Sequence, residues 1–70
     1  MDESLIVEVA HAIRLYLHDH PAAGDTDVGV HAWWIRWPGL PPPLTVTQAA
    51  LKRLQAEGAV QCRYGIWQRA

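Results

Sequence analysis

The sequence predicts one small α+β domain, mainly α, in which three helices precede a short C-terminal β-hairpin. Three observations lead to this class. Apolar residues recur at helical spacing over residues 4–19, a similar segment over residues 45–57 ends at a glycine, and residues 59–69 alternate around a Tyr-Gly pair. A chain of 70 residues has room for one domain, which we assign to residues 1–70.

The first predicted helix spans about residues 4–19. Its apolar side chains repeat at spacings of three and four: Ile6, Val9, Ile13 and Tyr16 or Leu17. Ser4 or Asp2 can cap its first turn, because a short polar side chain accepts hydrogen bonds from the free backbone N–H groups there. Pro21 disfavours helical angles at the residue before it, so the helix is expected to end at that point.

The second predicted helix spans about residues 26–36, with Asp25 or Thr26 as its cap. We expect one face to be formed by Val28, Ala32 and Ile35. Gly29 costs this helix about 1 kcal/mol relative to alanine, so tertiary packing must hold it. The proline-rich residues 37–43 end it.

The third predicted helix spans about residues 45–57. Thr45 and Gln48 fit a capping box, and Gly58 suits the C-terminal cap. The side chains expected in the core are Val46, Ala50, Leu51 and Leu54. The side chains expected outside are Thr47, Gln48, Lys52 and Gln55.

The C-terminal residues 59–69 form the predicted hairpin. With Tyr64 and Gly65 as the two loop residues, Arg63 opposes Ile66 and Cys62 opposes Trp67. Because side chains alternate across a strand, the expected buried face consists of Val60, Cys62 and Trp67.

Composition argues against several classes of protein. A single cysteine excludes a disulfide scaffold and a zinc site with several cysteine ligands. The low cysteine content and an N-terminus unlike a signal peptide together predict a cytoplasmic protein. No apolar run is long enough for a membrane span. His11 and His18 lie two helical turns apart, too far to share a metal ion. The sequence has no phosphate-binding loop or nucleophile motif, so we expect neither a cofactor nor catalysis.

Charge is distributed unevenly along the chain, although the net charge is −1. Residues 1–35 carry six acidic side chains and one basic one, a net charge of −5. Residues 36–70 carry five basic side chains and one acidic one, a net charge of +4. Such asymmetry indicates a basic binding face, or complementary patches of a dimer.

The segment from Leu44 to Trp67 resembles the winged helix-turn-helix family. The shared pattern is a helix ending in Leu-Lys-Arg-Leu, then a glycine, an apolar residue and a hairpin with a glycine at its turn. The resemblance implies binding of double-stranded DNA in transcription regulation, with the third helix in the major groove and the hairpin on the backbone. The DNA-binding residues it implies are Thr45, Thr47, Gln48, Lys52, Arg53, Arg63 and Arg69.

A second interpretation is a winged helix that binds protein, such as a small accessory or phage-encoded factor. Trp33, Trp34 and Trp37 lie close together in the sequence, and a domain of this size cannot easily bury all three. At least one should reach the surface and serve as an interface, either in a homodimer or with a larger protein. The proline-rich loop would contribute to the same surface.

Overall fold

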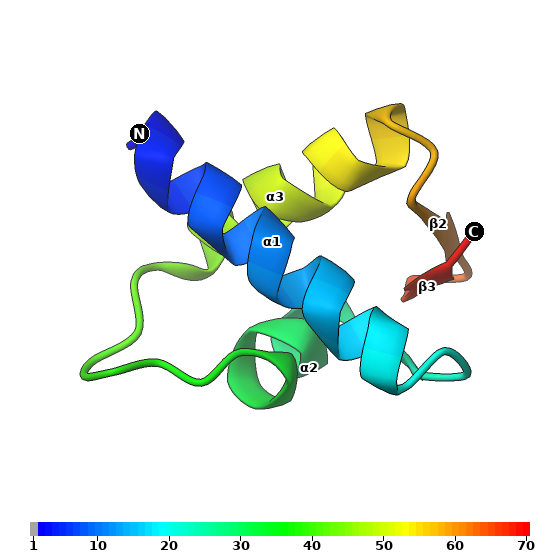
Figure 1. Ribbon diagram of the computed structural model, residues 1–70, viewed down its shortest axis with the longest axis horizontal. Coiled ribbons are helices and arrows are strands. Elements are labelled where there is room, and N and C mark those ends of the chain that lie inside the picture. Colours follow the sequence, from blue (N-terminus) through cyan, green and yellow to red (C-terminus); the bar gives the residue numbers. More distant parts are fainter. Residues whose placement is uncertain (1) are drawn as a thin grey trace.

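The computed structural model describes residues 2–70. It contains α1 (Glu3–Asp19), β1 (Gly24–Asp25), α2 (Asp27–Gly29), η1 (Val30–Trp34), α3 (Leu44–Ala56), β2 (Val60–Arg63) and β3 (Ile66–Arg69). α2 and η1 follow each other without a break and form the second helical segment. Figure 1 shows α1 crossing α2 and α3, with the hairpin at one end of the molecule. Three helical segments followed by an antiparallel hairpin confirm the predicted class and give a winged-helix topology.

Helix α1 forms as predicted, and Asp2 is its cap. The Asp2 carboxylate accepts hydrogen bonds from the backbone N–H groups of Ser4 and Leu5, at 3.0 and 3.4 Å. The helix ends before Pro21, as expected. Its buried stripe follows the predicted spacing: Ile6, Val9, Ala10, Ile13 and Leu17.

The second helical segment is capped by Thr26, as expected, but its buried face differs from the prediction. Val28 is 58% exposed and Ala32 is also exposed, whereas Val30 and Trp34 are buried. Ile35, the third residue predicted on that face, is buried as expected, but it lies beyond the helical segment. The two pairs have the same spacing of four positions, so packing against α1 and α3, and not the local spacing, selects which pair is buried. The segment ends at Trp34, earlier than predicted, because Ile35 is extended.

Helix α3 begins at Leu44, and the expected capping box is wrong. Pro43 occupies the cap position without a side-chain hydrogen bond, so Thr45 already lies inside the helix. The other end forms as predicted. Gly58 has a φ of 78°, its N–H bonds to the carbonyl of Gln55, and the next N–H bonds to that of Leu54. These two bonds make a Schellman cap, in which glycine supplies the left-handed residue.

The hairpin has the predicted register. Cys62 pairs with Trp67 and Arg63 with Ile66, and both loop residues have positive φ, as a type I′ turn requires. An unpredicted strand, β1, pairs with β3 and gives the sheet order β1-β3-β2. The expected burial of Cys62 is wrong: its partner Trp67 lies on the central strand β3 and reaches the core, whereas Cys62 lies on the edge strand β2 and is exposed.

The core lies where α1 crosses α3 and η1. Its largest fully buried apolar side chains come from three helices: Ile13, Val30, Leu51 and Leu54. Trp67 closes the core on the side of the sheet. No helix among residues 2–70 is long and apolar enough to cross a membrane.

Candidate nucleic-acid interface

The outer face of α3 is polar and largely uncovered. Thr45, Lys52 and Gln55 are exposed, and Gln48 is half-buried beside them. A helix advances 100° per residue, so positions 45, 48, 52 and 55 fall on the side opposite the buried Val46, Ala50 and Leu54. These four side chains, which we call the α3 outer face, can donate and accept hydrogen bonds in a groove.

Thr47 does not belong to the α3 outer face, and the expectation that it does is wrong. Its side chain is fully buried, and its Oγ1 lies 2.6 Å from Nδ1 of His31 in a hydrogen bond. On the helix it points 140° away from Lys52, into the apolar arc of α3. Thr47 therefore links α3 to η1 and is not available to DNA.

Gln48 is held by a second contact between the same two segments. Its Nε2 donates to Oδ2 of Asp27 at 2.8 Å. The contact orients the amide at the edge of the α3 outer face, and it leaves the amide oxygen free to accept a hydrogen bond. It also places a carboxylate beside this face, which opposes the approach of phosphate.

Arg53 lies on a different side of α3 from Lys52. Its guanidinium forms an ion pair with Glu3 of α1, and Arg14 forms another with Glu57 at the end of α3. Both pairs span α1 and α3 on the surface, where such contacts contribute about 0–1 kcal/mol each. Arg53 is therefore directed toward α1 and away from the residues expected to contact DNA with it.

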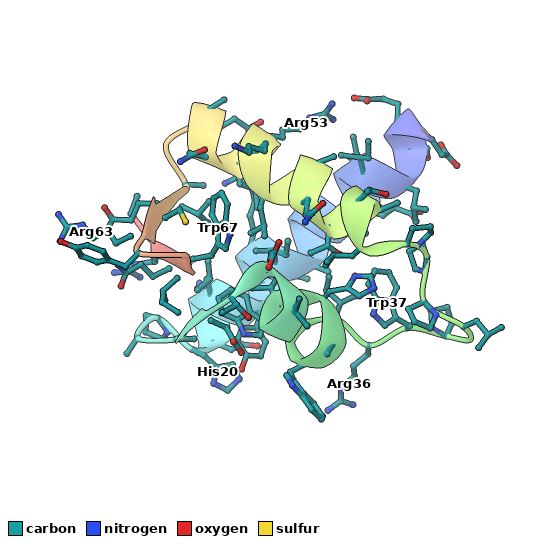
Figure 2. All side chains as sticks on the ribbon, turned by 180° about the vertical axis from the view of Figure 1, so that it is seen from behind. His20, Arg36, Trp37, Arg53, Arg63 and Trp67 are labelled. Carbon is teal, nitrogen blue, oxygen red and sulfur yellow. The ribbon has the colours of Figure 1, made fainter. Side chains whose placement is uncertain are left out.

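The hairpin presents two exposed cations, Arg63 and Arg69. Tyr64 stands at its tip and is fully exposed, a position that sequence reasoning assigned to the turn but to no function. Among residues 2–70, no carboxylate pairs with Lys52, Arg63 or Arg69. In Figure 2, Arg63 lies at the far end of the hairpin, while Arg53 and Arg36 point to opposite sides of the molecule. The basic half of the chain therefore does not form one continuous patch.

The three neighbouring tryptophans have three different environments. Trp34 is buried and stacks on Tyr16, with ring centroids 4.7 Å apart. Trp37 is half-buried and donates from Nε1 to the carbonyl of His31 at 2.8 Å. Trp33 is 78% exposed, so it is the one that reaches the surface. Trp34 belongs to the core, and its expected role in an interface is wrong.

Other kinds of site have little support in the described part of the chain. No three His, Cys, Asp or Glu side chains within residues 2–70 come together as metal ligands. Comparison with family models, curated proteins and solved structures gives no match. Function therefore has to be argued from the residues themselves.

Proposed function

We propose that this protein binds double-stranded DNA through the α3 outer face and the β2–β3 hairpin. The observation that carries the proposal is the placement of the free cations. Arg14 and Arg53 are used in ion pairs with carboxylates. Four Lys or Arg side chains have no such partner among residues 2–70: Lys52 on the outer face, Arg63 and Arg69 on the hairpin, and Arg36, which lies elsewhere on the molecule and outside the proposed site. A polar helix face followed by a basic hairpin is the arrangement with which winged helices contact a groove and its backbone.

The proposed roles follow from side-chain chemistry. Thr45 and Gln48 carry hydroxyl and amide groups that can bond to base edges or to phosphate oxygens. Lys52, Arg63 and Arg69 supply positive charge to phosphates. Thr47 and Arg53 are left out of the site, because one is buried and the other is paired with α1.

Three phosphate contacts set a measurable salt dependence. The logarithm of the binding constant falls against the logarithm of salt concentration with a slope of about −0.9 per contact, hence about −2.7 for three. Affinity should then fall about 40-fold between about 50 and 200 mM salt. This is a modest dependence, in keeping with a net charge of −1.

The test is a fluorescence-anisotropy titration of a mixed-sequence duplex at several salt concentrations. Lys52→Gln should weaken binding and reduce the slope by about 0.9, because one phosphate contact is lost. Arg53→Gln is the matched control on the same helix, and it should leave the slope unchanged. If the wild-type protein does not bind at micromolar concentration in low salt, the proposal is refuted. If Arg53→Gln loses as much as Lys52→Gln, the assignment of the face is refuted.

A second function, docking on a larger protein, is favoured by one observation. Trp33 is 78% exposed, although the burial of so large an apolar side chain is strongly favourable. Tryptophan is also enriched among the residues that contribute most of the binding energy in protein interfaces. Trp33→Ala should keep the fold and lose a protein that co-purifies with the wild type. Val28→Ser, another exposed apolar position on the same helical segment, is the control. Equal recovery of the partner with Trp33→Ala would exclude this surface.

A further inference from the structure

An apolar groove lies between α1 and the chain that follows η1. Its walls are Leu5, Val9 and Ala12 on one side and Ile35, Trp37 and Pro38 on the other, and its volume is about 240 Å³. Pockets for drug-sized ligands begin at about 300 Å³, whereas a cavity of about 150 Å³ already accepts benzene. The groove is therefore of a size to receive one or two apolar side chains.

The loop beside this groove carries an apolar side chain of the matching kind. Leu40 is 98% exposed, so it fills no site in its own chain. It lies between Pro38 and the run Pro41–Pro43, whose fixed φ angles limit the conformations of the loop. The prolines on both sides of Gly39-Leu40 reduce the conformational freedom that the backbone of the loop would lose on binding, which favours its use in an interface.

The groove also carries one charge of each sign. Glu8 lines it from α1 and Arg36 lines it from the opposite wall. Neither side chain has an ion-pair partner among residues 2–70. A surface that holds both a carboxylate and a guanidinium is complementary to a two-fold related copy of itself, in which each charge can meet its opposite.

We propose that two copies of this chain associate through this groove, with Leu40 of each copy inserted into the groove of the other. The groove is lined by residues of α1 and of the segment after η1, and the loop that carries Leu40 lies at the opposite end of the molecule from the hairpin (Figure 1). Figure 2 likewise shows Trp37, which lines the groove, on the opposite side of the molecule from Arg63 of the hairpin. Dimerisation therefore leaves the hairpin free.

The proposed contact involves one loop and one groove from each copy of a small protein, so we expect the dimer to be weak and dependent on concentration. A stable interface buries about 800 Å² per partner. That area is about one sixth of the total surface of this protein, which is 4622 Å². Sedimentation equilibrium from micromolar to about millimolar protein covers the range in which such an association becomes visible. Because the measurement involves no DNA, its result is independent of the proposed function.

Leu40→Ser is the first variant, because an exposed loop residue can change without affecting the fold. It should raise the dimer dissociation constant roughly 100- to 10,000-fold, because the symmetric dimer loses two buried leucine side chains, one from each copy. Val28→Ser is the control, an exposed apolar position outside the groove, and it should leave the constant unchanged.

Charge exchange tests the pairing across the interface. Glu8→Arg and Arg36→Glu should each weaken the dimer, and the double variant should restore it, because the two signs are then exchanged in both copies. A wild-type protein that stays monomeric at about millimolar concentration would overturn the proposal. So would a dimer that Leu40→Ser leaves intact, since its interface would lie elsewhere.

Discussion

Replacing Thr47 by valine tests whether this residue has a structural role inside the domain. The substitution preserves the shape of the side chain and removes the hydroxyl that lies 2.6 Å from Nδ1 of His31. A hydrogen bond of this kind contributes about 0.5–1.5 kcal/mol net, and an abandoned buried partner costs about 1–3 kcal/mol. His31 is only half-buried, so water can replace part of the lost bond. We expect a loss of about 1 kcal/mol in the free energy of unfolding.

For a domain of this size, 1 kcal/mol corresponds to a fall in Tm of roughly 4–8 °C, which calorimetry resolves easily. Thr45→Val is the matched control: the same substitution at an exposed site of the same helix should change stability by less than about 0.5 kcal/mol. A double-mutant cycle of Thr47→Val with His31→Phe should return a coupling of about 1 kcal/mol. Equal stability of the two valine variants, or zero coupling, would refute the structural role.

Three further substitutions have directions that follow from local geometry. Gly29→Ala should not bring the gain of about 1 kcal/mol that alanine normally gives a helix, because its Cβ would lie 1.9 Å from Oδ1 of Asp25, and that carboxylate would have to turn away and lose its hydrogen bond from the Thr26 N–H; a rise in the urea midpoint would contradict this. Tyr64→Asn should stabilise it by up to about 1 kcal/mol, since Tyr64 has a φ of 54° and asparagine tolerates that conformation better; thermal melts decide the sign. Leu54→Ala removes a fully buried side chain at a cost of about 2–5 kcal/mol, a large part of the roughly 3.5–10 kcal/mol expected for this length, so the urea midpoint followed by circular dichroism should fall steeply; an unchanged midpoint would show that the site can collapse.

Local rules were sufficient for several elements whose determinants are neighbours in sequence, although the capping box expected of Thr45 and Gln48 did not form. The apolar stripe of α1, the Thr26 cap and the Gly58 cap each depend on residues within a few positions of one another. The hairpin register followed from the two loop residues alone, because a two-residue loop fixes which residues face each other.

Elements that depend on distant residues were not predictable in the same way. β1 is two residues long, too short to show alternation, and it exists only because β3 pairs with it. The side chain of Thr47 is polar, which suggested an outward position, yet its angle on α3 lies within the apolar arc. Its burial is possible because His31, 16 positions away, satisfies the hydroxyl. The helical spacing of α3 therefore indicates the burial of Thr47, and only the identity of its partner depends on a distant residue.

The candidate site was predictable in part for the same reason. Lys52, Arg63 and Arg69 are exposed, as expected of surface cations, and the sequence alone places Lys52 on the side of α3 away from the leucines. Lys52 and Arg53 are neighbours in sequence, so they appear to be one basic group. The 100° between them directs Arg53 toward Glu3 of α1, a partner 50 positions away. Their separation follows from the packing of α1 against α3.

The polar contacts between the second helical segment and α3 bear on function because they are directional. Apolar packing depends mainly on buried area and permits small shifts of one helix along another. The bond between His31 and Thr47 and the bond from Gln48 to Asp27 join specific atoms, and they involve adjacent positions of α3. Together they fix the rotation of α3 and its position along its axis. The α3 outer face is thereby presented at a defined orientation, which is the property that a helix needs if it is to contact a groove.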